Sequence, residues 1–171
     1  MKKITLLLLV TALMCITVEA QESWKTTTLD NFSIQHPNDW KADTSKTVGV
    51  DLILYAPQEI GDNFKENINV VVQDLSEYNL NLDSYTKLSE EQIKNMLEGG
   101  KITKSERITA DSKTYHRIQY VGTQSGIALK FEQRYYVEND TAYVLTVTCL
   151  NSNFDAYIVL SRKIFDTFQM K

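Results

Sequence analysis

The chain has 171 residues, of which 43% are hydrophobic and 23% charged, with only 6 Gly and 2 Pro. This composition is that of one globular domain, and it excludes a disordered, collagen-like or repeat chain. Aspartate and glutamate outnumber lysine and arginine by 22 to 18, which gives a net charge of -4. Because the chain lacks a strongly basic field, we exclude nucleic acid as a partner.

The start of the chain has the pattern of a secretory signal peptide. Two lysines precede an apolar run over residues 4–16, which is shorter than the roughly 20 residues that a membrane span needs. Val18–Ala20 then has the small-residue pattern of a cleavage site before Gln21. We predict a signal peptide at 1–20 and a single domain at 21–171, exported to the periplasm or the cell exterior and without a transmembrane segment.

Cys15 offers a second interpretation, that of an acylated lipoprotein cysteine. Leu13 and Met14 before it are large where a lipoprotein signal has small residues, so we favour export without a lipid anchor. Removal of the leader leaves Cys149 as the single cysteine, so no internal disulfide can form. Since Cys149 shares a predicted strand face with apolar residues, we expect a buried and inert thiol.

Seven segments show the period-two alternation that is typical of strands. They cover residues 31–36, 48–54, 68–72, 102–108, 113–122, 127–137 and 142–150. The last four are separated by short polar turns at 110–112, 123–126 and 138–140. This spacing favours an antiparallel meander, because parallel crossovers need longer connections.

Two segments change to the helical period. The first has Asp83 as its expected N-cap, Gly99 as its stop and apolar residues on one half of the helix, namely Tyr85, Leu88, Ile93, Met96 and Leu97. The second follows Asn153, another expected N-cap, with an apolar stripe that faces the sheet, namely Phe154, Tyr157, Ile158, Ile164, Phe165 and Phe168. Helices segregated on an antiparallel sheet predict the α+β class.

Residues 32–40, with the sequence FSIQHPNDW, resemble the opening F-x-I-x-Y-P-x-x-W signature of PsbP-like and DcrB-like proteins, with His36 where that family more often has Tyr. The end of the chain is also similar, since a strand at 142–148 precedes a terminal amphipathic helix that finishes at 164–168. This resemblance implies an α/β/α sandwich with a central antiparallel sheet flanked by helices. It also implies an exported, often membrane-associated accessory protein.

The sequence predicts no catalytic residues, no metal site and no cofactor. His36 and His116 have no third ligand at zinc-site spacing, and we interpret His116 as a hydrogen-bonded or half-exposed structural residue. Glu59, Asp62 and Glu66 lack the ligand pattern of a calcium loop. We therefore expect them to form a solvated acidic loop.

The loop from Ala56 to Asn67 is longer than the about 2 to 5 residues of a common hairpin connection, and long loops often carry function. Its apolar residues Ile60 and Phe64 are our candidate binding residues. The alternative is that both side chains fold back and cap an open end of the sandwich, as lone apolar loop residues commonly do.

Together these features favour an exported, noncatalytic accessory or binding module of the bacterial cell envelope, whose partner is a protein or another envelope component. The alternative is a cell-envelope hydrolase with an unidentified active site. We rank the hydrolase lower because the sequence places no nucleophile, base and orienting group together.

Overall fold

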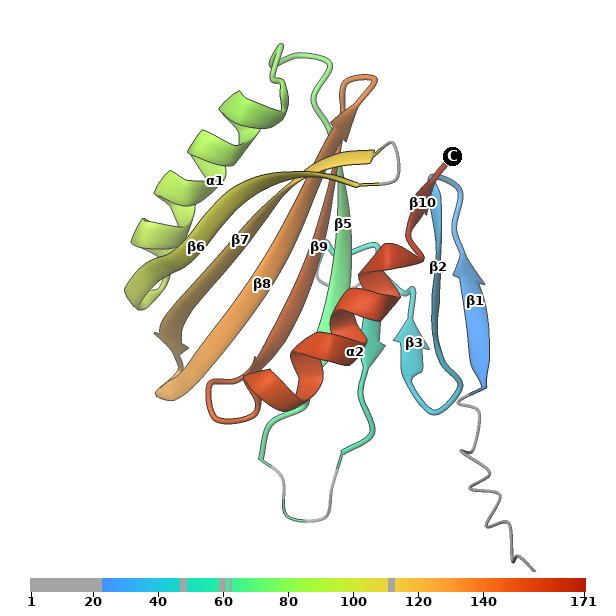
Figure 1. Cartoon of the computed structure of the whole chain (residues 1–171), viewed down its shortest axis with the longest axis vertical. Coiled ribbons are helices and arrows are strands. Elements are labelled where there is room, and N and C mark those ends of the chain that lie inside the picture. The colour runs from blue at the N-terminus through green and yellow to red at the C-terminus, as the bar shows by residue number, and fades with distance from the viewer. Residues whose placement is uncertain (1–22, 47–48, 59–60, 62, 111–112) are drawn as a thin grey trace, which may run out of the picture.

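The computed structural model describes residues 23–46, 49–58, 61, 63–110 and 113–171, so the predicted signal peptide lies outside the described residues. The elements are β1 Trp24–Thr28, β2 Phe32–Pro37, β3 Lys41–Asp43, β4 Leu52–Tyr55, β5 Asn67–Asp74, α1 Leu82–Met96, β6 Glu98–Ala110, β7 Lys113–Gln124, β8 Ile127–Glu138, β9 Thr141–Leu150, α2 Phe154–Asp166 and β10 Gln169–Met170. A seven-stranded sheet has the order β3-β4-β5-β9-β8-β7-β6, and a three-stranded sheet has the order β1-β2-β10 (Figure 1).

Strands β6 to β9 form the predicted antiparallel meander. At the β8–β9 turn, Asn139 and Asp140 have φ values of 49° and 54°, and at the β7–β8 turn Ser125 and Gly126 have values of 51° and 79°. Two consecutive left-handed residues make the tight hairpin turn whose twist matches the flanking strands, and Asn, Asp and Gly adopt it most readily. The turns predicted at 123–126 and 138–140 are confirmed.

The predicted strand at 31–36 is β2, the middle strand of the small sheet, with β1 and β10 paired on either side of it. Phe32, Ile34 and His36 alternate along β2 and are buried, which is the expected period of a half-covered strand. The short strands β1, β3 and β10 are additional to the prediction.

The strand predicted at 48–54 is shorter than expected, since β4 covers only Leu52–Tyr55 and Val48 lies outside the described residues. Gly49 has a φ of 74°, a left-handed conformation that interrupts a strand. Asp51 then directs its carboxylate to the next strand, where Oδ2 accepts a hydrogen bond from the backbone N–H of Val72 at 2.8 Å. Regular pairing therefore starts after Asp51.

Helix α1 has a different N-cap from the predicted one. The side chain of Asn81 accepts a hydrogen bond from the backbone N–H of Ser84 at 3.0 Å, and Ser84 Oγ accepts one from the backbone N–H of Asn81 at 2.9 Å. This reciprocal pair is a capping box, so the prediction of Asp83 as N-cap is wrong. Asp83 lies in the first turn instead, where its charge is favourable to the helix dipole. The helix ends at Met96, shortly before the predicted stop at Gly99.

Helix α2 matches its prediction. It begins directly after Asn153, and the predicted stripe is buried at Phe154, Ile158, Ile164, Phe165 and Phe168 and partly buried at Tyr157. The Asn153 side chain makes no capping bond but donates to Glu66 Oε1 at 3.1 Å.

The two helices pack on opposite faces of the large sheet. Alternate β9 residues belong to two separate apolar clusters, one containing Leu145 and the α2 residue Phe165, the other containing Val144 and the α1 residue Ile93. The small sheet lies on the same side as α2 (Figure 1). An antiparallel sheet with segregated helices confirms the α+β class.

Among the described helices, none is long and apolar enough to cross a membrane.

Candidate functional site

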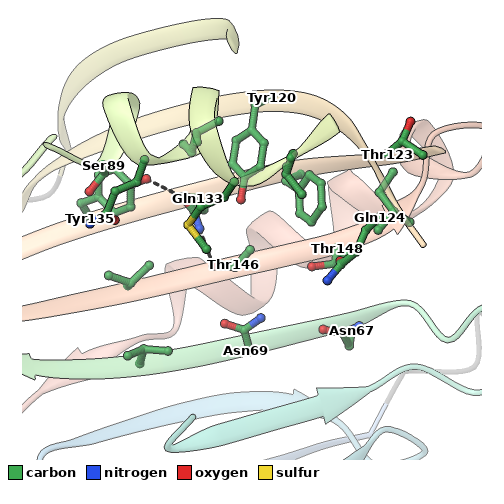
Figure 2. A pocket seen from close by; sticks show the side chains of 18 of the residues that line it. Asn67, Asn69, Ser89, Tyr120, Thr123, Gln124, Gln133, Tyr135, Thr146 and Thr148 are labelled. Carbon is green, nitrogen blue, oxygen red and sulfur yellow. Dashed lines mark hydrogen bonds between the residues drawn. The ribbon is translucent and has the colours of Figure 1, made fainter. Parts of the chain in front are cut away.

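Helix α1 leaves part of its face of the large sheet uncovered. It contacts β6, β7 and β8, and beside it a groove of about 820 Å³ opens over the central strands β5, β9 and β8 (Figure 2). This volume lies within the range of small-molecule sites, roughly 300 to 1,000 Å³. We take this groove as the candidate functional site.

The floor of the groove combines polar side chains from one face of β5, β9 and β8 with an apolar cross-strand pair, Val71 and Val144. Strand alternation places Asn67 and Asn69 on this face while Ile68 and Val70 point to the opposite core. Pairing then aligns two rows across the sheet. One row contains Asn69, Thr146 and Gln133, and the other contains Asn67, Thr148, Phe131 and Tyr120.

Part of this floor is fixed by internal hydrogen bonds. Gln133 Nε2 donates to Thr146 Oγ1 at 3.1 Å, and the Tyr135 hydroxyl donates to Gln133 Oε1 (Figure 2). At the end of the groove nearest the start of α1, the Tyr85 hydroxyl donates to Gln73 Oε1 at 2.6 Å. The orientation of the Gln133 amide is thereby set by partners on both sides.

The walls of the groove are apolar. Tyr120 and Phe131 stack with ring centroids 4.5 Å apart and an interplanar angle of 12°. From α1, Ile93 is buried against the sheet, whereas Met96 is 78% exposed at the edge of the groove. Leu88, which the periodicity predicts on the apolar half of α1, is 46% exposed. The apolar stripe of this helix therefore extends beyond the area that the sheet covers.

Electrostatically the groove is close to neutral. Burial raises the pKa of Tyr85 to about 12, and burial also raises the pKa of Tyr120 and Tyr135, so these hydroxyls stay protonated at neutral pH. Among the described residues that line the groove, Glu98 is the one with a charged side chain. The site is therefore suited to hydrogen bonding and apolar contact rather than to ion pairing.

The two candidate residues of the long loop have different outcomes. Phe64 is half-buried, packs against the cluster that contains Ile93, and lines the groove. Ile60 lies outside the described residues. The structure thus brings Phe64 to the groove without deciding between its binding and capping roles.

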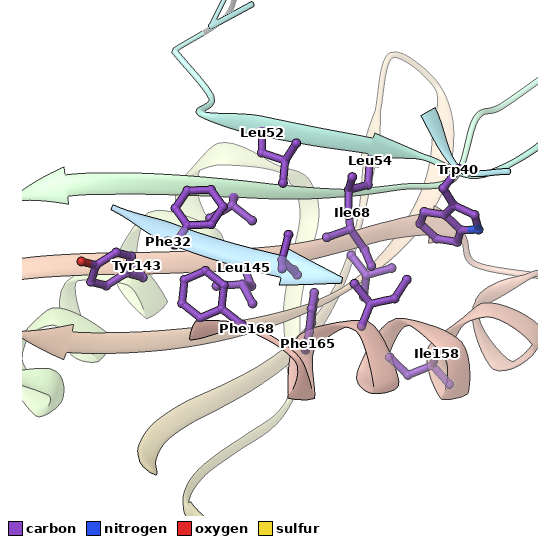
Figure 3. Close-up of a cluster of buried hydrophobic side chains, with 14 of the residues drawn as sticks. Phe32, Trp40, Leu52, Leu54, Ile68, Tyr143, Leu145, Ile158, Phe165 and Phe168 are labelled. Carbon is purple, nitrogen blue, oxygen red and sulfur yellow. The ribbon is translucent and has the colours of Figure 1, made fainter. Parts of the chain in front are cut away.

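The opposite face of the sheet is a closed apolar core between the large sheet, α2 and the small sheet (Figure 3). Cys149 lies in this core, fully buried beside the strand-face neighbours Tyr143, Leu145 and Val147. Burial, with a contribution from the charge of Glu66, raises the pKa of the thiol to about 12. The predicted burial of Cys149 is confirmed, and its inertness stays a prediction.

His116 is the closest approach to a catalytic arrangement among the described residues. Its Nε2 lies 2.7 Å from Ser105 Oγ, and that hydroxyl donates to Glu90 Oε1 at 2.6 Å. In a nucleophilic triad the carboxylate orients the histidine and the histidine receives the serine proton. Here the carboxylate holds the serine, so His116 is not oriented as a base. Half-buried and hydrogen-bonded, His116 has the structural role that the sequence predicts.

Glu66 departs from the prediction of a solvated acidic loop. It is 2% exposed, and its Oε1 accepts hydrogen bonds from Asn153 Nδ2 at 3.1 Å and from the backbone N–H of Leu150 at 3.4 Å. Glu66 thus ties β5 to the β9–α2 turn. Glu59 and Asp62 lie outside the described residues. Within the part of the chain that is described, no three His, Cys, Asp or Glu side chains are grouped as a metal site would need.

The groove residues themselves escaped the sequence analysis. The start of β5, Asn67–Val70, alternates polar and apolar residues, a pattern that is also expected for a strand with one face in water. The same reading applies to Thr146 and Thr148. The pattern does not show that helix α1 lies beside this polar face and forms one side of the groove.

An antiparallel sheet with a helix on each face, and a neutral groove beside one helix, defines the α+β architecture of this chain. Its solved structural neighbours have the PsbP-like and DcrB-like fold, so the resemblance predicted from the sequence is confirmed at the level of the fold. No protein-family model and no curated protein sequence matches the chain.

For three of these neighbours, the match covers most of this chain and nearly all of the neighbour. Cyanobacterial PsbP (CyanoP) from Synechocystis sp. PCC 6803 matches with a TM-score of 0.68 and 13% identity, over 90% of this chain and 96% of that one. LpqN, involved in cell envelope biogenesis of Mycobacterium tuberculosis, matches with a TM-score of 0.61 and 11% identity, over 87% and 91%. PA94 from Pseudomonas aeruginosa, a protein of unknown function, matches with a TM-score of 0.61 and 17% identity, over 84% and 94%.

Proposed function

We propose that this chain is an exported, noncatalytic accessory module of the bacterial cell envelope, and that it binds an envelope component in the groove beside α1. The observation that carries the proposal is the groove itself, a ligand-sized opening of about 820 Å³ with hydrogen-bonding and apolar groups side by side. The finer architecture that we propose is the α/β/α sandwich of PsbP-like proteins.

The leader sequence supports the location. Cleavage before Gln21 would release residues 21–171 into the periplasm or the cell exterior, and the large residues before Cys15 argue against acylation. The neighbour LpqN is involved in cell envelope biogenesis in its own organism, which fits an envelope role for a chain of the same fold.

The binding role fits the chemistry better than hydrolysis does. Among the described residues, the contact between Ser105 and His116 is the one observation that could favour a hydrolase. In it the carboxylate of Glu90 accepts from the serine, whereas in a catalytic triad the carboxylate accepts from the histidine. Ser105 also lies outside the residues that line the groove. We propose in addition that the loop at 56–67 extends the binding surface through Phe64, with Ile60 as its second contact.

The test is native mass spectrometry of protein recovered from outside the cytoplasm. We expect a mature chain that starts at Gln21 and carries additional mass from an envelope component. Asn69→Arg places a long charged side chain in the floor of the groove and should abolish this additional mass. Gln35→Arg, on an exposed position of β2, is the matched control and should retain it. A chain acylated at Cys15, or a bound component that persists in Asn69→Arg, would contradict the proposal.

A further inference from the structure

We infer that the groove beside α1 binds an uncharged saccharide chain. The inference rests on the proposed binding function and specifies the ligand class of the same site. It is carried by three features of the groove, namely its lack of cationic side chains, its grid of amide and hydroxyl groups, and its aromatic wall.

The charge of the lining excludes most anionic ligands. No lysine or arginine is among the described residues of the groove, and Glu98 adds a negative charge at the end of α1. Phosphates and carboxylates are recognised in proteins through charge-assisted hydrogen bonds from such cations or from helix N-termini. Helix α1 lines the groove from Tyr85 to Met96, and the residues before Tyr85, which carry the free N–H groups of the helix N-terminus, are not among the lining residues. A neutral ligand is therefore favoured.

The floor presents groups that both donate and accept hydrogen bonds. Asn69 and Thr146 are direct cross-strand partners, as are Asn67 and Thr148. Such partners have Cβ atoms about 5 Å apart, and residues two apart on one strand are about 7 Å apart. Asn67 Nδ2 already donates to the Lys65 carbonyl oxygen at 3.0 Å. A sugar hydroxyl is likewise both donor and acceptor, so a polyhydroxylated ring can bind the groups of this grid that internal hydrogen bonds leave available.

Two of these side chains keep all of their hydrogen-bonding groups available to a ligand. Among the described residues, the side chains of Asn69 and Thr148 take part in no internal hydrogen bond, whereas Gln133 is already held by Tyr135 and Thr146. Both strands are interior to the sheet, since β5 pairs with β4 and β9, and β9 pairs with β5 and β8. An extended peptide therefore has no strand edge to join here.

The row of Asn67 and Thr148 continues into the aromatic pair Phe131 and Tyr120. Both rings are 6% exposed, so they add a small apolar surface at the end of the row. A row that changes from amide to hydroxyl to apolar surface matches a sugar, whose hydroxyls lie at the ring edge and whose C–H groups form apolar faces. An acyl chain would match the wall and the pair of Val71 and Val144, but not the amides and hydroxyls beside them. It would also strip water from the amides of the floor without replacing their hydrogen bonds, which is costly.

The experiment is an NMR titration of the mature ¹⁵N-labelled protein with two neutral probes, maltotriose and N,N′,N″-triacetylchitotriose. Trigalacturonate serves as an anionic probe of similar size, and decanoate as an acyl probe. We expect at least one neutral trisaccharide, at millimolar concentration, to shift backbone amides of β5 and β9 in a saturable manner. Both other probes should leave these amides unchanged.

A matched pair of variants tests the contacts. Asn69→Ala with Thr148→Val removes the two free hydrogen-bonding groups and should weaken trisaccharide binding about tenfold or more, because each net hydrogen bond contributes about 0.5 to 1.5 kcal/mol. Thr26→Val, at an exposed position of β1 outside the groove, should bind as the parent does. Thermal unfolding of each variant checks that it folds.

Three results would overturn the inference. These are no shift with either neutral probe, shifts of the groove by decanoate or trigalacturonate at comparable concentration, or unchanged affinity in the double variant. If the groove retains an envelope-derived component in native mass spectra while neither trisaccharide binds, the proposed function stands and the saccharide assignment fails.

Discussion

The two faces of the large sheet are built from the same strands but are used differently. Along β9, Tyr143, Leu145, Val147 and Cys149 point to the face under α2 and are all buried apolar residues. Their neighbours Thr146 and Thr148 point to the other face and line the groove. The difference follows from what covers each face, because α2 and the small sheet together close one side, whereas α1 alone covers only part of the other.

This division would separate the stability of the fold from the proposed binding function. The closed face holds the larger of the two apolar clusters, and the open face has a smaller one under α1. The residues of the open face that α1 leaves uncovered are released from packing constraints. Polar side chains can then occupy a central position of the sheet, where they would destabilise a closed core. The predictions below test this separation, beginning with the largest expected effect.

The largest effect is expected from Phe165→Ala on the closed face. Phe165, on the buried face of α2, is 1% exposed, and truncation of a buried Phe costs about 3 to 5 kcal/mol of unfolding free energy. Thr148→Ala on the open face should change it by no more than about 0.5 kcal/mol. Urea denaturation of both variants measures the contrast. Similar losses from the two substitutions would show that the groove floor is part of the core.

Next in size is Gly122→Ala, which targets the junction of α1 and the sheet. A Cβ at Gly122 would lie 2.8 Å from the Leu97 Cβ, too close for two carbon atoms. The helix end would have to shift, and overpacking of this kind costs about 1 to 3 kcal/mol. Leu97→Gly removes the obstructing Cβ with the rest of the side chain, so the double variant should lose less than the sum of the single losses. Additive losses in denaturation would show that this contact does not position α1.

The rate at which a reagent labels the Cys149 thiol measures how well the closed face excludes solvent. A thiol reagent should label it slowly in the native protein and at once in denaturant, because burial holds its pKa near 12 and excludes the reagent. Cys149→Ala should cost on the order of 1 kcal/mol of stability and leave trisaccharide binding unchanged. Rapid labelling of the native protein would show that the α2 face opens to solvent.

The sequence predicted the closed face better than the open one, for a physical reason. The stripe from Phe154 to Phe168 and the turns at 123–126 and 138–140 are local patterns, and local patterns survive in the fold. The groove depends on where α1 ends relative to β5, which is a tertiary distance. From the sequence, Asn67 and Asn69 are therefore indistinguishable from residues on an ordinary solvent-facing side of a strand. Glu66 is predicted to be a solvated loop residue, because its buried hydrogen bond with Asn153 joins residues that are far apart in the chain.

The smallest expected effect is the pH dependence of stability between about pH 7 and 5, a range above the ordinary pKa values of carboxylates. His36 lies in the closed face, with Nε2 2.9 Å from Thr27 Oγ1 and Nδ1 3.0 Å from the Pro37 carbonyl oxygen. Burial lowers its pKa, and burial also lowers that of His116 beside α1. The unfolded chain therefore binds more protons as the pH falls through about 6.5, so the folded state loses stability on acidification.

The variants His36→Gln and His116→Gln measure how much of this pH dependence of stability comes from each face of the sheet. Each variant should show a smaller decrease of the melting temperature from pH 7 to 5 than the parent, since each removes one group whose proton affinity differs between the folded and unfolded states. The decrease that remains in either variant comes from the other histidine, and the double variant should show almost none. A melting temperature that rises on acidification, or a double variant that keeps the full decrease, would show that neither ring is held neutral by the fold.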